Sequence, residues 1–154
     1  MSQLKPERCL EVLREAILEI AETMLFVEVG EGSAQEKPAE IASEYSAVIG
    51  YGEGIQGSLH LSGSKAAILK LLSAFLGESR DEMDDEMNDA FGEMANLVAG
   101  GIQGRLEPEL GSISLTPPEV ASGRINHRAA GAVPACVSHL FDLDGEIFSV
   151  EVFY

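Results

Sequence analysis

A long amphipathic helix over residues 84–106 (DDEMNDAFGEMANLVAGGIQGRL) is the feature that most limits how this chain folds. Apolar residues recur there every three or four positions, which is the spacing of one helix face. That face contains Met87, Ala90, Phe91, Met94, Leu97, Val98, Gly101 and Ile102. The opposite face contains Glu86, Asp89, Glu93, Asn96, Gly100 and Gln103. Since residues three or four apart are neighbours on a helix surface, we expect Glu93 and Asn96 to lie one turn apart and to point toward solvent.

The glycines of this helix need a reason, because each one in a helix interior costs ~1 kcal/mol relative to alanine. Gly101 is explained by close packing of the helix on a sheet, and Gly104 by fraying near the helix end. Gly92 and Gly100 flank the Glu93–Asn96 pair. We interpret them as leaving that pair bare, so that another backbone can approach it closely.

Composition predicts one acidic domain spanning residues 1–154. The net charge of −16 argues against nucleic acid and anionic membranes as partners, because both require clustered lysine and arginine. No apolar run approaches the ~18 residues of a membrane-spanning helix, and the N-terminus lacks the apolar core of a signal peptide. Cys9 and Cys136 have no metal-binding or redox spacing, so we expect reduced thiols in a cytoplasmic protein.

The pattern along the chain predicts an α+β fold with two similar halves, in which long helices pack on one face of a largely antiparallel sheet. Helices are expected at 6–24, 65–76 and 84–106, and strands at 25–29, 41–51, 55–62, 112–115, 132–141 and 146–153. Polar loops are expected at 30–40 and 122–128. Each half contains a long helix, a short strand and a hairpin. In the first half, Glu19 and Glu22 stand where Glu93 and Asn96 stand in the second.

Taken without further information, the Glu93–Asn96 pair is more simply a solvated helix surface. The acidic run at 82–86 is best explained by the preference for negative charge at a helix N-terminus. His60, His127 and His139 have no cysteine or carboxylate partners at ligand spacing, so a metal site is not expected from them. These residues alone therefore leave the function open.

Residues 92–101 (GEMANLVAGG) resemble the Glu-x-x-Asn helix of the CheC/CheX/FliY family of chemotaxis phosphatases. Asp89, Glu93, Asn96 and Gly100 match that motif in place. Residues 49–61 are similar to the family's glycine-punctuated hairpin, and 115–123 to its strand–proline–strand–glycine segment. The chain has one such motif rather than two, on the second of the two repeated helices. In this it resembles CheX more than CheC.

The resemblance implies a phosphatase that hydrolyses the aspartyl phosphate of a phosphorylated CheY-type response regulator. Asn96 would orient the attacking water, and Glu93 would pair with the active-site lysine of the regulator. Asp89, Gly92, Gly100 and Gln103 would lie around this pair and contact the partner. The chain would need no cofactor of its own, because Mg²⁺ would arrive bound to the regulator.

The resemblance also implies a homodimer, and the long alternating last strand (EIFSVEVFY) is the expected pairing edge. Two alternatives remain open. One is a non-catalytic CheX-like module that binds a response regulator or another signalling partner. The other is a scaffold protein whose acidic face only keeps it in solution.

Overall fold

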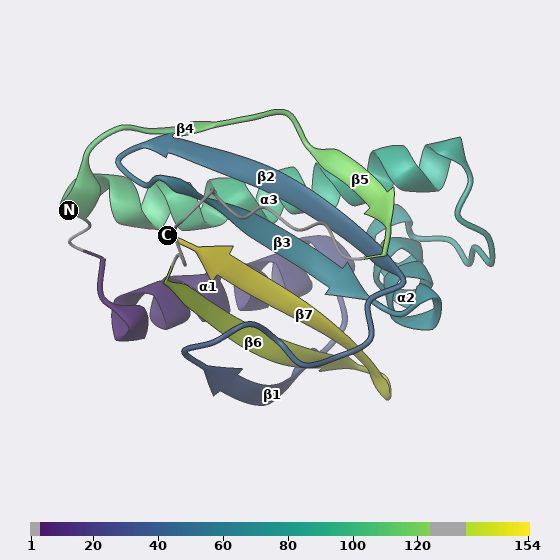
Figure 1. The fold of residues 1–154 in the computed structure, drawn as a ribbon. Helices are drawn as coiled ribbons and strands as arrows, with labels where there is room; N and C mark the ends of the chain where they lie inside the picture. The colour runs from purple at the N-terminus through teal and green to yellow at the C-terminus, as the bar shows by residue number, and fades with distance from the viewer. Residues whose placement is uncertain (1–3, 124–134) are drawn as a thin grey trace.

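The computed structural model describes residues 4–123 and 135–154, in which helices pack on one face of an antiparallel sheet (Figure 1). The helices are α1 (Pro6–Ile20), the short π-helix η1 (Ala21–Leu25), α2 (Lys65–Leu76) and α3 (Asp85–Leu110). The strands are β1 (Gly30–Gln35), β2 (Tyr45–Glu53), β3 (Gly57–Gly63), β4 (Ile113–Leu115), β5 (Glu119–Ser122), β6 (Cys136–Leu143) and β7 (Glu146–Phe153). The predicted α+β class is confirmed.

The sheet order within these described residues is β1-β6-β7-β3-β2-β4, and β5 also pairs with β2. The two halves are therefore interlocked. The strand that follows α1 pairs with the second hairpin, and the strands that follow α3 pair with the first. This arrangement places α1 against β6 and α3 against β2 on the same face of the sheet.

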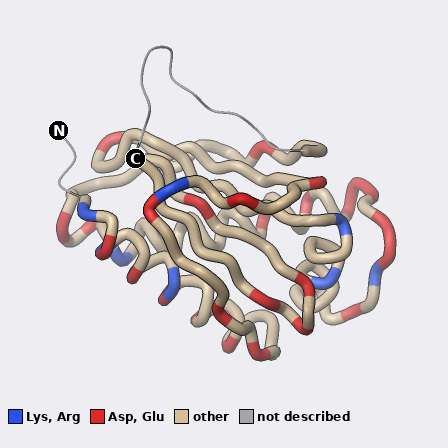
Figure 2. The backbone as a smooth tube through the Cα atoms, turned by 60° about the horizontal axis from the view of Figure 1, so that its bottom comes forward, with Lys and Arg blue, Asp and Glu red and all other residues tan. Residues whose placement is uncertain are grey.

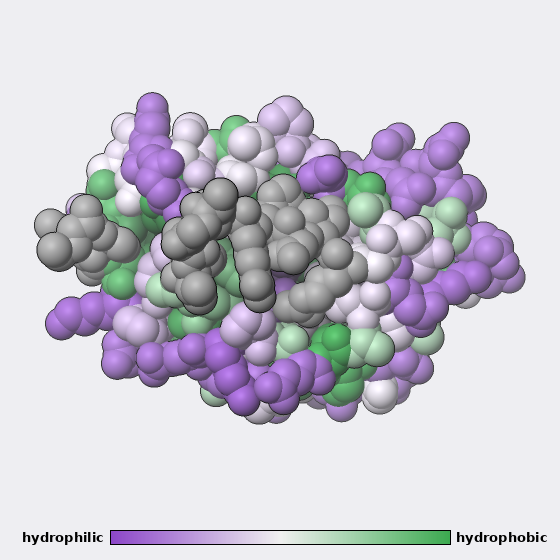
Figure 3. Space-filling model, in the orientation of Figure 1, coloured by the Kyte–Doolittle hydropathy of each residue, from purple (hydrophilic) through white to green (hydrophobic). Residues whose placement is uncertain are grey.

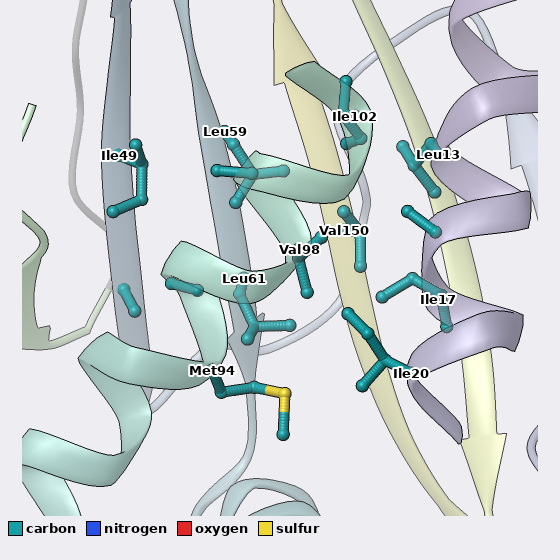
Figure 4. Close-up of a cluster of buried hydrophobic side chains, with 14 of the residues drawn as sticks. Leu13, Ile17, Ile20, Ile49, Leu59, Leu61, Met94, Val98, Ile102 and Val150 are labelled. Carbon is teal, nitrogen blue, oxygen red and sulfur yellow. The ribbon is translucent and has the colours of Figure 1, made fainter. Parts of the chain in front are cut away.

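The core lies between the two long helices and the sheet (Figure 4). Its buried side chains include Leu13 and Ile17 of α1, Met94, Val98 and Ile102 of α3, and Leu59, Leu61 and Val150 of the central strands. The apolar face predicted for α3 is the face that is buried here. Its polar face is consequently turned away from the core.

Helix ends follow local chemistry. The Ser64 hydroxyl accepts a hydrogen bond from the Ala67 N–H (3.1 Å) at the start of α2, and Gly77 ends that helix with a φ of 74°. At the start of α3, Asp84 Oδ1 accepts a hydrogen bond from the Met87 N–H (2.9 Å). This bond, with help from Arg80, lowers the pKa of Asp84 below its ordinary value. The N-cap of α3 is thus Asp84.

One strand prediction and one loop prediction at the first edge of the sheet are wrong. Residues 25–29 form no strand, and the polar segment expected to be a loop contains β1 instead. The side chains of β1 are mostly exposed, so a glycine-rich polar sequence can form this edge without burying polar groups. Arg14 of α1 holds it in place through two hydrogen bonds to the Glu31 carboxylate, at 2.6 and 2.9 Å.

The last strand is not the expected dimer edge. β7 pairs with β3 on one side and with β6 on the other, so its backbone groups are already used. Apolar and polar residues alternate along β7 because its two sides face different surroundings. One side packs on the helices, and the other is buried among polar side chains of the opposite face of the sheet. The β1–β2 connection crosses this face (Figure 1). The N–H of Ala39, in this connection, donates to the buried carboxylate of Glu151 (2.9 Å). The homodimer remains a prediction, and β7 is no longer the edge expected to form it.

The remaining differences concern boundaries. Strand β2 begins at Tyr45 and α3 continues to Leu110, whereas 41–51 and 84–106 were expected. Strand β5 is the second strand of the strand–proline–strand–glycine segment that the resemblance implies at 115–123. His127, most of the expected loop at 122–128 and the start of the expected strand at 132–141 lie outside the described residues. None of the helices in the described ranges is long and apolar enough to cross a membrane.

Candidate functional site

Glu93 and Asn96 are both exposed near the middle of α3, as predicted, with buried Met94 and Ala95 between them. One turn of helix separates the two side chains. Within residues 4–123 and 135–154, neither side chain is hydrogen-bonded or ion-paired to the rest of the chain. A carboxylate and a carboxamide with free hydrogen-bonding capacity are therefore presented together to solvent.

A groove of about 480 Å³ runs beside this pair. It is lined by Asn88, Asp89, Gly92, Glu93, Asn96, Pro118 and Val120. The helix supplies the polar side, and the segment that enters β5 supplies an apolar wall. In the view of Figure 3, the surface is mainly hydrophilic with small hydrophobic areas. The groove combines both kinds of surface next to the free amide of Asn96.

The apolar wall is anchored to the sheet. Thr116 Oγ1 accepts a hydrogen bond from the Gly50 N–H (2.7 Å), and the Thr116 N–H donates to the Gly50 carbonyl (2.9 Å). Further along, Val120 lies opposite Ala47 in the pairing of β5 with β2. Pro118 stands between these two attachments, and its ring restricts the backbone. The wall is consequently fixed relative to α3.

Glycines around the pair serve different contacts. A Cβ at Gly92 would lie 3.1 Å from Pro118 Cγ, so the missing side chain lets the groove wall approach the helix. A Cβ at Gly101 would lie 3.1 Å from Ala16 Cβ. Gly101 thus brings α3 close to α1, and not to the sheet as expected. A Cβ at Gly100 would meet no atom of another described segment within 4 Å, so that side of the pair is open in the described part of the chain.

The other predicted contact residues differ in position. Asp89 is exposed and lines the groove. Gln103 is half-buried outside it, and its Nε2 donates to the Ile113 carbonyl of β4 (2.6 Å). That amide links α3 to the strand that follows it. The structure therefore gathers Asp89, Gly92, Glu93 and Asn96 at one groove and uses Gln103 as a structural link.

Pro118 and Val120 are groove residues that the sequence reasoning did not identify as such. The resemblance implies a strand–proline–strand–glycine segment at 115–123 (LTPPEVASG), but it gives this segment no part in the site. Its place beside α3 follows from long-range pairing with β2, which a local pattern does not contain. The available signal was Gly92 itself, because a glycine inside a helix often marks a close approach by another segment.

Among the residues that the structure describes, the charges lining the groove are those of Asp89 and Glu93, and none of its lining residues is lysine or arginine. Such a surface favours a partner that brings positive charge. Among the described residues, no three His, Cys, Asp or Glu side chains are grouped so that they could hold a metal ion.

Comparison with known proteins gives the family. The family model described as "Chemotaxis phosphatase CheX" matches residues 45–137. A curated relative, the CheY-P phosphatase CheX of Thermotoga maritima, is 38% identical over 86 residues, which are 55% of this chain and 56% of the relative. The aligned part of the chain thus spans about half the length of that relative.

Solved structures share the fold. The CheX protein of Vibrio vulnificus superposes with a TM-score of 0.80 at 23% identity, covering 94% of this chain and 97% of that one. The CheX–CheY–BeF3–Mg²⁺ complex of Borrelia burgdorferi gives a TM-score of 0.75 at 23% identity, covering 94% and 96%. Because the family model matches more than half of its residues, this chain belongs to the CheX family of chemotaxis phosphatases.

Proposed function

We propose that this protein is a cytoplasmic phosphatase that hydrolyses the aspartyl phosphate of a CheY-type response regulator. The observation that carries the proposal is the exposed Glu93–Asn96 pair beside the groove of α3, which has no hydrogen-bond or ion-pair partner among the described residues. The curated relative in Thermotoga maritima is named a CheY-P phosphatase, which supports the same activity here. The site has one open side, and the regulator completes it.

Asn96 is the residue that acts on the reacting water. An acyl phosphate is already activated, so the main task is to hold water in line with the phosphorus atom. The carboxamide of Asn96 has an acceptor oxygen and two N–H donors, which fix the orientation of a water molecule. A carboxylate at this position would repel the phosphoryl oxygens. The exposed amide is thus suited to the reaction in both charge and hydrogen-bonding capacity.

Glu93 is the residue that positions the regulator. Its carboxylate lies one turn from Asn96 and has no ion pair within the described chain. A lysine of the regulator's active site would form a charge-assisted hydrogen bond with it. That bond would fix the distance between the acyl phosphate and the Asn96 amide.

Magnesium belongs to the partner in this proposal. The Borrelia burgdorferi complex is described with CheY, BeF3 and Mg²⁺ together, which supports a metal that travels with the regulator. In this chain, Asp89 and Glu93 are the acidic residues lining the groove, and both lie on α3. We assign them to contacts with the regulator.

The test is release of inorganic phosphate from each response regulator encoded by the same organism, with and without this protein. We expect acceleration of at least about tenfold, which corresponds to a barrier lowered by about 1.4 kcal/mol, for at least one phosphorylated regulator. Binding of a phosphorylated regulator without faster release would identify a non-catalytic module. Neither binding nor release with any of them would contradict the proposal.

The open space at Gly100 gives a separate prediction. Gly100→Ala should raise the free energy of unfolding by about 0.5–1 kcal/mol, because alanine favours the helix and its Cβ would meet no neighbouring atom within 4 Å. It should also weaken regulator binding about tenfold if the regulator packs closely there. Urea unfolding and a binding titration measure both effects. Gly104→Ala, equally open and one turn further along, is the control and should change stability only.

A further inference from the structure

A second exposed apolar surface follows the end of α1. The side chains of Met24, Phe26 and Val27 are 43%, 80% and 39% exposed, although all three are large and hydrophobic. Leu25, between them, is 5% exposed and belongs to the core. The chain therefore buries one side chain of this segment and turns its neighbours outward. Clustered exposed hydrophobic side chains typically mark a surface that binds something.

The surface is hollowed. A groove of about 560 Å³ lies along it, with Leu18, Ala21, Glu22, Phe26, Val27 and Glu28 among its lining residues. It is on a different helix from the Glu93–Asn96 pair, and the two grooves share no lining residue. We call it the α1 groove. It is thus a site separate from the proposed phosphatase site.

The backbone holds Phe26 in this exposed position. Phe26 ends η1 with φ 55° and ψ 35°, in the left-handed region that a bulky side chain rarely adopts. A π-helix precedes it, which is also uncommon and is found frequently at functional sites. The exposed aromatic ring is therefore built into the turn, and is not the frayed end of a helix.

The charged side chains that line the α1 groove indicate what kind of partner would bind there. Its charged lining residues are Glu22 and Glu28, which are exposed and have no ion pair within the described chain. Nearby Glu19 and Glu31 are already paired, with Arg105 and Arg14 respectively. A second copy of this chain would bring the same carboxylates and a net charge of −16, so it is disfavoured (Figure 2).

We propose that the α1 groove docks an amphipathic segment of another protein, with an apolar side chain against Phe26 and Val27 and with lysine or arginine beside Glu22 and Glu28. Apolar burial would provide the affinity, and the two carboxylates would select for positive charge. The site lacks an amide at the position of Asn96, because the first repeat has Glu22 there. It is therefore a binding site, and it does not depend on the phosphatase activity.

The test uses two synthetic helical peptides of roughly 18 residues, one of leucine and lysine and one of leucine and glutamate. Fluorescence anisotropy measures their binding to the full protein at about 50 and 300 mM salt. We expect the leucine–lysine peptide to bind and the leucine–glutamate peptide not to bind. Phe26→Ser should weaken binding about tenfold, and E22Q with E28Q should weaken it and reduce its salt dependence.

Two controls locate the binding. Val120→Thr changes an apolar residue of the other groove and should leave peptide affinity unchanged, as should Asn96→Ala. Equal affinity of wild type and Phe26→Ser would overturn the proposal, as would binding of both peptides alike or of neither. A concentration-dependent dimer that Phe26→Ser dissociates would also overturn it, because the occupant would then be a second copy.

Discussion

Asn96→Ala should return the dephosphorylation rate of the bound regulator to the rate of the regulator alone. The expected loss is on the order of 10²-fold, the usual size for removing one group that orients or stabilises reacting atoms. Asn96 is exposed and has no hydrogen-bond partner in the described chain, so the free energy of unfolding should change by no more than about 0.5 kcal/mol. Phosphate release from a preformed complex at saturating protein measures the rate.

The controls separate chemistry from binding. Gln56→Ala removes an exposed carboxamide from the β2–β3 turn and should keep full activity. Asn96→Asp keeps the size of the side chain but adds negative charge, so it should be as inactive as the alanine variant. Unchanged regulator affinity with a lost rate is the predicted combination. A normal rate in Asn96→Ala would remove this residue from the reaction.

Glu93→Lys should weaken complex formation by at least about tenfold, because it places a positive charge opposite the regulator's lysine. The ion pair is lost and replaced by repulsion, so the dissociation constant should rise more than the rate of the bound complex falls. Titration of a phosphorylated regulator, or of one carrying beryllofluoride, measures this. Glu53→Lys makes the same charge change at an exposed residue at the end of β2 and should have little effect. Equal affinities for the two variants would count against the role of Glu93.

The most predictable part of the molecule is α3, because both of its faces follow directly from helical spacing. Met94 and Val98 are buried, and Glu93 and Asn96 are exposed, as the sequence indicates. The predictable elements also include α2, which lies between its N-cap Ser64 and its C-cap Gly77. In each case the determining interactions lie within a few residues along the chain.

The parts that were missed depend on contacts between distant residues. Strand β1 forms because β6 offers it an edge, and β7 is central because β3 pairs with one of its sides and β6 with the other. The groove wall at Pro118 exists because β5 pairs with β2 and brings that residue against Gly92. Helical spacing predicts that Gln103 is exposed, but the fold brings the Ile113 carbonyl beside it as a hydrogen-bond acceptor. Local patterns carry no information about these neighbours.

The structure of this protein bound to its regulator, with Mg²⁺ and beryllofluoride in place of the phosphoryl group, would test the central claim most directly. We expect the Asn96 amide to lie within hydrogen-bonding distance, about 3 Å, of the beryllofluoride or of a water in line with it. We also expect the Glu93 carboxylate about 3 Å from a lysine of the regulator. A complex in which the regulator docks elsewhere, with both side chains still in solvent, would contradict this claim.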